Sequence, residues 1–444
     1  MSRCIIVCCG MLGLVLTSCS THEHNLTSIR RAYHSGNLPL AEAKIDRAMK
    51  RRSKDADVLK LDRALVLLGQ GKARESEQLL REARDRFDKL EQKAIGEMAM
   101  SMLTDDQAIY YAGEDYEKVL IRAFLAMANL IHDGSDANAY ALQVAAKQRE
   151  IIEKGKAEDG KNPKASYKQV AVGAYIHAAL REATHVNYDD AERSLKLVCD
   201  WSPEFRSGPK ELDRVKNGRH SSPGNGVLYV FTLVGRGPYK KERMEVASTV
   251  ALLVADRIVT ATAKRSLPPN IAPIKVPRVV VPRNRVQQVG VQLDGRPAGV
   301  TETITDVGRM AKEQSDALLP YVIGRAIARR VLKKGIIYGV KEVAGVEKHT
   351  LPDLALTVAG VAWEATESAD TRCWGLLPEK IQVLRVELPA GKHQLALEPL
   401  DTNNTPQGPK QTTVVDIANG RNTYVLAGFP SGQLVGKIVT SQPR

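Results

Sequence analysis

The sequence predicts a protein of the α+β class, with helices in its first half and strands in its second. Residues 26–201 are rich in Ala, Leu, Glu, Lys, Arg and Gln, contain very little proline, and carry apolar side chains at helical spacing. Residues 227–440 contain short runs of β-branched and aromatic residues, separated by turns with Gly and Pro. Residues 202–226, rich in Gly, Pro and Ser, are interpreted as the linker between two domains.

The first 18 residues have the composition of an export leader. Their apolar run, residues 4–16, is too short to span a bilayer. It ends in the sequence LTSC, which resembles the lipobox of bacterial lipoproteins, where the cysteine becomes the acylated N-terminus of the mature chain. We therefore predict that residues 1–18 are removed, that Cys19 is lipidated, and that residues 19–25 form a tether. The alternatives are an ordinary secretory leader and a short anchor helix.

Acylation of Cys19 would place the protein in the cell envelope, because several fatty acyl chains on one residue hold a protein on a membrane. In Gram-negative bacteria an Asp after the acylated Cys resembles an inner-membrane retention signal, so Ser20 favours the outer membrane, facing the periplasm. The net charge of +13 is compatible with nucleic acid, but export argues against that partner. Anionic lipids and acidic wall polymers remain, although the dispersed charge favours a solvated surface without a polyanionic ligand.

Removal of the leader leaves two cysteines besides Cys19, namely Cys199 and Cys373. They lie in different predicted domains, and we expect two unpaired thiols, although export would permit a disulfide. The sequence has no CxxC motif and no Cys/His spacing typical of zinc sites. No metal or cofactor is therefore expected.

Repeated turn signals divide the helical region. Gly36 and Gly71 each follow an apolar helical run and are 35 positions apart (71 minus 36), close to the period of about 34 residues of tetratricopeptide (TPR) repeats. Similar patterns surround Gly113 and Tyr188, with irregular spacing. We predict TPR-like helical hairpins with a concave groove that could bind a partner segment. The alternative is a closed helical bundle, which has no such groove.

The second half carries clear hairpin signals. VELPAGKHQLAL places a Pro-Ala-Gly turn between two alternating runs, and IANGRNTYVL places one at Asn419-Gly420. Short strands and tight turns predict a β-sandwich-like domain over residues 227–440.

A helix at about residues 303–345 interrupts this β pattern, and Pro320 is expected to end or kink it. Its second half is basic, through Arg325, Arg329, Arg330, Lys333 and Lys334. Such a helix can lie on an anionic membrane. The favoured interpretation is that it covers a sheet, with its basic face in solvent.

Catalytic motifs are missing from the sequence, which has no GxSxG, HExxH, P-loop or GxGxxG. Residues 369–380, ADTRCWGLLPEK, form the one compact cluster that resembles a site. Its Cys373 lacks a nearby histidine to act as a base, since His393 is 20 residues further on (393 minus 373). The favoured interpretation is structural: Asp370 pairs with Arg372 and Trp374 caps the core. We therefore predict that the protein is not an enzyme.

The segments PYVIGRAIARRVLKK and ADTRCWGLLPEKIQVLRVELPAGKH resemble an uncharacterised bacterial family of exported TPR-like lipoproteins. The resemblance covers most of the mature chain, and its most specific parts are Asp370-Thr371-Arg372 and Leu388-Pro389-Ala390-Gly391. It implies an envelope lipoprotein with helical repeats before a β-rich region, and it implies no activity or functional residues.

The combined hypothesis is an envelope lipoprotein that binds a protein partner through a TPR-like groove and acts as a scaffold or assembly adaptor. The alternative is binding or hydrolysis of cell-wall polymer by the β-rich domain. A third hypothesis is a lipid-surface protein that uses the basic helix around residues 325–334.

Overall fold

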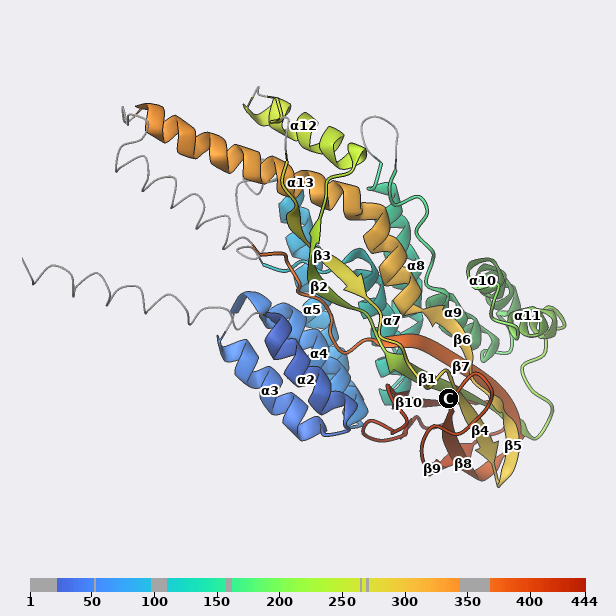
Figure 1. The fold of residues 1–444 in the computed structure, drawn as a ribbon. Helices are drawn as coiled ribbons and strands as arrows, with labels where there is room; N and C mark the ends of the chain where they lie inside the picture. Colours follow the sequence, from blue (N-terminus) through green and yellow to red (C-terminus); the bar gives the residue numbers. More distant parts are fainter. Residues whose placement is uncertain are drawn as a thin grey trace, which may run out of the picture.

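The computed structural model has helices through the first half of the chain and sheets in the second, which confirms the predicted α+β class (Figure 1). It describes residues 22–51, 53–96, 110–156, 162–263, 266–268, 271–343 and 368–444. The predicted leader, Cys19 and the start of the predicted tether lie outside these ranges. The first described helix begins at His22, inside the segment that the sequence assigns to the tether.

Most described helices of the first half are joined in pairs by short turns. Gly36 and Gly71 close two of these turns with φ angles of 76° and 81°, which a glycine adopts without steric cost. The third pair turns at Gly134, which the sequence analysis did not single out, while Gly113 lies just before a helix. The elements are α2 (His22–His34), α3 (Leu38–Arg51), η2 (Ser53–Asp55), α4 (Ala56–Gly69), α5 (Ala73–Gly96), α7 (Asp115–His132), α8 (Ala137–Glu153), α9 (Ala171–Glu182), α10 (Tyr188–Trp201) and α11 (Gly208–Lys216).

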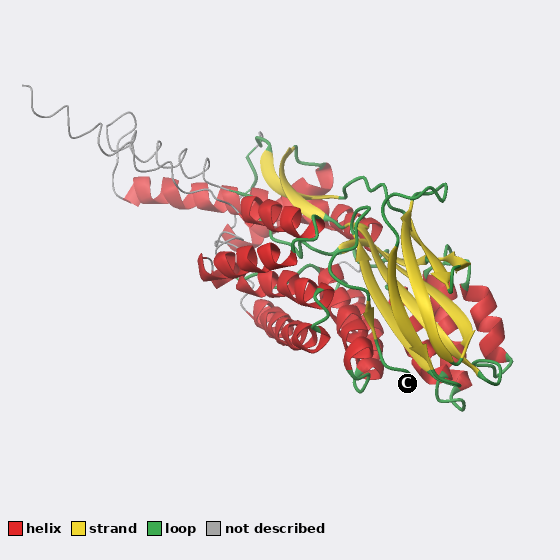
Figure 2. Cartoon of the chain, turned by 90° about the horizontal axis from the view of Figure 1, so that it is seen from below, coloured by secondary structure: helices red, strands yellow, loops and turns green. Residues whose placement is uncertain are grey.

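The second half contains two larger sheets, a two-stranded ribbon and two helices (Figure 2). The five-stranded sheet has the order β11-β10-β1-β7-β6, the four-stranded sheet β5-β4-β8-β9, and the ribbon β2-β3. The elements are β1 (Asn225–Arg236), β2 (Tyr239–Glu245), α12 (Thr249–Ala263), β3 (Ile274–Val280), β4 (Gln288–Leu293), β5 (Arg296–Val300), β6 (Glu302–Asp306), α13 (Val307–Val343), β7 (Pro378–Pro389), β8 (Gly391–Leu400), β9 (Gln411–Ile417), β10 (Asn422–Phe429) and β11 (Val439–Thr440).

Strand β1 is the centre of the five-stranded sheet and joins two hydrophobic layers. It runs parallel to β10 and antiparallel to β7. Tyr229 and Phe231 belong to the core shared with the helices, whereas Leu228 and Val230 pack with the four-stranded sheet. The alternation follows from the two-residue period of a strand. One face of the central sheet is thus covered by helices and the other by a second sheet.

A single core runs from the helical region into the five-stranded sheet, across the segment interpreted as a linker. Residues 202–226 contain α11 and the buried Phe205 and Val215. Pro209 lies in the first turn of α11, where a helix tolerates proline, so the breaker-rich composition there marks a helix start.

Helix α13 begins at Val307, because the preceding residues form β6, and it continues through Pro320. Figure 1 shows it as a bent rod whose second half leaves the body of the protein. There it packs on α12, which the sequence analysis did not predict, and on β3. These elements share a separate small core, which includes Ala251, Val276 and Ile327. We call this projecting part the arm and define it as residues 239–263, 271–280 and 318–343.

A buried charged network fastens the helices to the central sheet. Glu182, at the end of α9, is 1% exposed and lies 2.7 Å from Arg214 of α11 and 3.5 Å from Arg385 of β7. The hydroxyl of Tyr229 in β1 donates to the same carboxylate. Nearby, Tyr175 donates to Glu211 at 2.9 Å, and burial raises the pKa of Glu211 to about 7. Elements α9, α11, β1 and β7 therefore meet at the carboxylate of Glu182.

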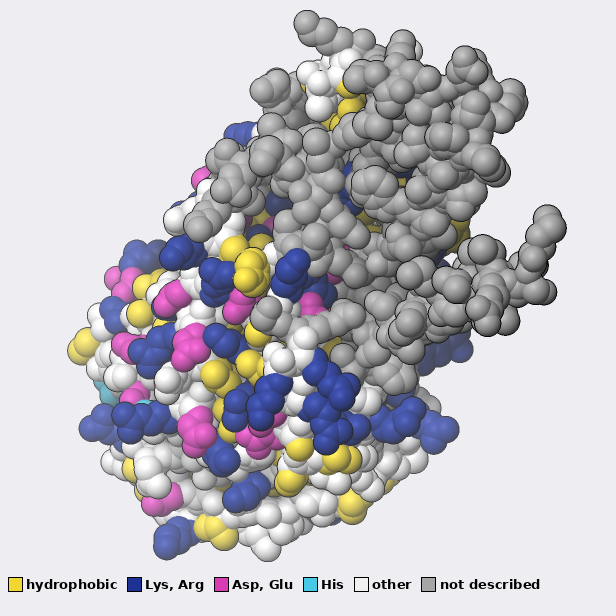
Figure 3. Space-filling view, turned by 90° about the vertical axis from the view of Figure 1, so that its left-hand side faces the viewer, with side chains coloured by type: hydrophobic (Ala, Val, Ile, Leu, Met, Phe, Trp, Pro, Cys, Tyr) yellow, Lys and Arg dark blue, Asp and Glu magenta, His cyan; other side chains and the backbone are white. Residues whose placement is uncertain are grey.

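The surface carries mixed charge. On the face that Figure 3 shows, Lys and Arg side chains alternate with Asp and Glu side chains, in keeping with the dispersed charge of the sequence. Within the described residues, no helix combines the length and apolar character needed to cross a bilayer.

Candidate binding cleft

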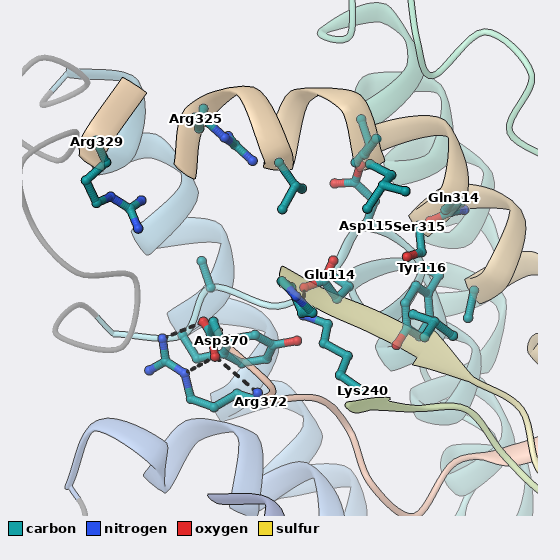
Figure 4. A pocket seen from close by; sticks show the side chains of 18 of the residues that line it. Glu114, Asp115, Tyr116, Lys240, Gln314, Ser315, Arg325, Arg329, Asp370 and Arg372 are labelled. Atoms are coloured by element: carbon teal, nitrogen blue, oxygen red, sulfur yellow. Dashed lines mark hydrogen bonds and ion pairs between the residues drawn. The ribbon is translucent and has the colours of Figure 1, made fainter. Parts of the chain in front are cut away.

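A cleft of about 420 Å³ opens between the start of α7 and the middle of α13 (Figure 4). One wall is apolar and comes from α12, β3 and α13. The opposite wall comes from residues before α7, from β2 and from the loop before β7, and it is polar. The side chains used below are Leu318, Leu319, Val322 and Arg325 of α13 on the first wall, and Glu114, Asp115, Lys240, Asp370 and Arg372 on the second.

The charges of the polar wall are matched within the protein. Lys240 is buried and donates to Glu114. Burial alone would lower the pKa of Lys240, but Glu114 and Asp370 outweigh it and hold the pKa above its usual value. Arg372 donates to Asp370 at 2.7 and 2.8 Å. Burial would raise the pKa of Asp370, and the hydrogen bond from Arg372 holds it below its usual value.

Directly beneath this wall, Glu117 of α7 is a buried acceptor for four donors. It accepts from the Tyr111 hydroxyl at 2.7 Å, the Trp374 amide at 2.7 Å, the Glu114 amide at 3.1 Å and the Tyr116 hydroxyl at 3.3 Å. Burial, reinforced by the charge of Glu114, raises the pKa of Glu117 to about 7. The bond to Trp374 joins residues 257 positions apart, so α7 positions the loop that forms the polar wall.

Asp62 of α4 holds the same loop from a second side. Its Oδ1 accepts from the Leu376 amide at 2.9 Å, and the side chain is fully buried. Burial raises the pKa of Asp62 to about 8. The indole of Trp374 packs on Phe124 of α7, with ring centroids 5.2 Å apart.

The raised pKa of Asp62 predicts a pH dependence of opposite sign to that of most carboxylates. The folded state binds this proton more tightly than the unfolded state, so the resulting stability is complete below pH 3.8 and is lost as pH rises through about 8. Asp62→Asn cannot titrate. We therefore expect the unfolding free energy of the wild type, minus that of Asp62→Asn, to fall between pH 4 and pH 8 in urea titrations. The exposed Asp213→Asn is the control, and a difference that stays constant or rises would contradict the assignment.

The apolar wall carries one cation without an ionic partner. Among the described residues no carboxylate lies within ion-pair distance of Arg325, which Figure 4 shows beside the cleft. Gln314 is 7% exposed, lines the same cleft, and its Oε1 has no hydrogen-bond partner in the described part of the chain. A ligand with an anionic group and apolar side chains would match this wall.

The cluster that the sequence singled out forms part of this cleft. The Asp370–Arg372 ion pair is present and Trp374 is fully buried, as the structural interpretation predicted. Cys373 is also fully buried, and burial together with the charge of Glu117 raises the pKa of its thiol to about 12. Cys199 and Cys373 are unpaired, as expected. His393 instead lies 2.7 Å from Asp294.

The basic residues of α13 are divided. Arg325 and Arg329 line the cleft, whereas Arg330 lies 3.3 Å from the Pro273 carbonyl oxygen. The side chains of Lys333 and Lys334 and the lipidation site Cys19 are outside the described residues. Sequence reasoning missed Asp62, Glu117 and Lys240. Asp62 lies in a largely apolar stretch, which is a weak signal because a charged residue is buried only when it is paired. Glu117 and Lys240 have charged neighbours in the sequence and give no such signal.

Comparisons with protein-family models, curated proteins and solved structures find no match to this chain. No cluster of three or more potential metal ligands is present among the residues that the structure describes.

Proposed function

We propose that this protein is an envelope lipoprotein, anchored through Cys19, that binds a segment of a protein partner in the cleft between α7 and α13 and acts as a scaffold or assembly adaptor. The observation that carries the proposal is the asymmetry of the cleft. An aliphatic wall carries Arg325, which has no ionic partner among the described residues, and it faces a wall whose charges are already matched.

This asymmetry fits an extended segment better than a reactive substrate. A cleft of about 420 Å³ is in the size range of binding sites and accommodates a few side chains. The matched wall needs no neutralisation by the ligand, so binding would come from apolar contacts with Leu318 and Val322. A carboxylate on the segment would pair with Arg325 and fix its direction.

The proposal extends to the fold. We interpret α2–α3, α4–α5, α7–α8 and α9–α10 as TPR-like hairpins, because successive pairs contact each other through α3 and α4, α5 and α7, and α8 and α9, as in a repeat array. We interpret the two larger sheets as a sandwich-like unit, supported by the apolar layer between them. No catalytic step is proposed. The buried Cys373 and its raised pKa support that choice.

The wall-polymer alternative finds less support at this cleft. Tyr110 is 47% exposed, but Tyr111, Tyr116 and Tyr167 are buried and offer no open ring for a sugar. The carboxylate of Asp115 lies 2.7 Å from Lys164, so it too is already paired. In the described part of the chain, neither several open aromatic rings nor unpaired carboxylates converge at this cleft.

Site-specific photocrosslinking in cells tests the adaptor proposal. A photoreactive residue at Leu319, inside the cleft, is expected to capture one protein, and the same residue at Val414, exposed on β9, is the matched control. Repeating the capture with Cys19→Ser should weaken it and shift the protein from the membrane to the soluble fraction, with a changed apparent mass. Equal capture from both positions would contradict the cleft, and unchanged fractionation would contradict the anchor.

The captured segment, made as a peptide, then allows a quantitative prediction. Arg325→Gln should weaken its binding to the purified protein about tenfold, since a charge-assisted hydrogen bond contributes roughly 1.5–3 kcal/mol. Arg421→Gln, at an exposed arginine in the turn before β10, is the control. Ser315→Trp, which fills the cleft, should abolish binding. Binding that survives Ser315→Trp, or binding of wall fragments in place of the peptide, would overturn the proposal.

A further inference from the structure

The arm exposes a group of aliphatic side chains at the end of β2 and the start of α12. Met244 is 60% exposed, Val246 73%, Val250 50% and Leu253 59%. They occupy ten consecutive positions of the chain (244 to 253), and we call them the apolar tip. Single exposed apolar residues are ordinary, but a cluster of four marks a contact surface.

The packing of α12 explains why these side chains face outward. Its inner face, with Ala251, Ala255 and Val259, is buried in the small core of the arm. The backbone of α12 approaches α13 closely at Gly324, where an added Cβ would lie 2.8 Å from the Ala251 carbonyl oxygen. The two helices are therefore in tight contact along one side of α12. The opposite side of α12 carries Val250 and Leu253, whose side chains are exposed.

The arm as a whole has a positive net charge, with twelve Lys and Arg residues against four acids, Glu242, Glu245, Asp256 and Glu342. The two acids of β2 are paired with cations of β3, Glu242 with Lys275 and Glu245 with Arg278, each at 3.3 Å. Arg243 lies between them, is exposed, and has no acidic partner among the described residues. Residues 318–343 of the arm contain Arg325, Arg329, Arg330, Lys333, Lys334 and Lys341 against a single acid, Glu342.

We propose that the apolar tip inserts into the surface of an anionic lipid bilayer while the cations of the arm contact the headgroups. Aliphatic side chains without hydrogen-bonding groups suit the boundary of the acyl region, and cations beside them suit anionic headgroups. The arm would then be a second membrane contact, in addition to the lipid at Cys19. Because Arg325 is assigned to the cleft, the inference uses the other cations of the arm, and it does not depend on the partner that the cleft would bind.

Vesicle flotation tests the inference on the chain that starts at residue 19 and carries Cys19→Ser, because a leader or an acylated cysteine would bind vesicles by itself. We expect binding to vesicles of equal parts phosphatidylglycerol and phosphatidylcholine, weakened by salt, and at least tenfold weaker binding to pure phosphatidylcholine. Val250→Asp combined with Leu253→Asp should reduce binding about tenfold or more.

A matched control uses Val186→Asp combined with Val414→Asp, which adds the same charge at side chains that are 79% and 61% exposed elsewhere. This control should bind like the wild type. If both double variants lost vesicle binding equally, the added negative charge alone would explain the loss and the inference would be overturned. Equal vesicle binding by the wild type and the tip variant would also overturn it. Sedimentation of each protein without vesicles separates another outcome: a dimer that dissociates only in the tip variant would assign the patch to self-association and refute the bilayer assignment.

Discussion

Glu117→Leu is expected to lower the free energy of unfolding by about 4 kcal/mol. The substitution removes the acceptor of four donors, two tyrosine hydroxyls and two backbone amides, at a site with no solvent exposure. Each buried donor left without a partner costs roughly 1–3 kcal/mol, and the added apolar contacts of leucine offset only part of the total. Urea unfolding followed by circular dichroism measures the loss.

The control for this change is Glu75→Leu, at an exposed position in the first turn of α5, which should alter stability by less than about 0.5 kcal/mol. A loss at Glu117 no larger than at Glu75 would show that the donors find other partners. Because the amide of Trp374 is one of the donors, the variant should also lose photocrosslinking at Leu319 under conditions where it remains folded.

Glu182→Gln is expected to cost about 3 kcal/mol, although it changes the shape of the side chain very little. It removes the negative charge between Arg214 and Arg385, and both guanidinium groups are largely buried. Removing one member of a buried ion pair leaves a desolvated charge, which typically costs 3–5 kcal/mol. The neighbouring Glu211 compensates in part, because its carboxylate lies 4.0 Å from Arg214.

Glu192→Gln provides the same chemical change in a surface ion pair, 2.7 Å from Lys196, and should lower the melting temperature much less than Glu182→Gln does, because solvent screens the pair. Thermal unfolding of both variants at neutral pH gives the comparison. Equal melting temperatures would mean that the network at the junction of α9, α11, β1 and β7 contributes no more than a solvated pair, and that the helices are held to the sheet by apolar packing alone.

Local sequence predicted much of the secondary structure. Gly36 and Gly71 lie in turns, as the sequence predicted. This was predictable because glycine has no Cβ and can adopt a positive φ whatever the rest of the fold. The predicted turns between β7 and β8 and between β9 and β10 are present, but the predicted hairpins are wrong, because each turn carries the chain from one of the two larger sheets to the other. A local turn signal does not reveal which strand each flanking segment will pair with. Helix α12 was missed because it is apolar on nearly all sides, so its sequence has no amphipathic period. Helix α11 was hidden by the Gly-Pro pair at its start.

The candidate cleft was predictable only in part. Asp370 and Arg372 are two positions apart, so their pairing could be proposed from the sequence. Lys240 and Glu114 are 126 positions apart, and Asp62 and Leu376 are 314 apart. The residues next to them in the sequence do not indicate these partners. A charged or polar side chain is buried only when a partner satisfies it, and here the partner comes from a distant part of the chain.

The sequence by itself determined the class of the fold, the order of helices before strands, most of the turns and the expectation of a lipid anchor at Cys19. These depend on residues close together in the chain, through backbone preferences and the periodicity of apolar side chains. The tertiary structure alone decided that helices and central sheet share one core, that Glu117 and Asp62 hold the wall of the cleft, and that the arm turns an apolar tip outward. Those features depend on contacts between segments that are distant in the sequence. Each contact contributes to stability only after folding has brought both segments together and removed them from water.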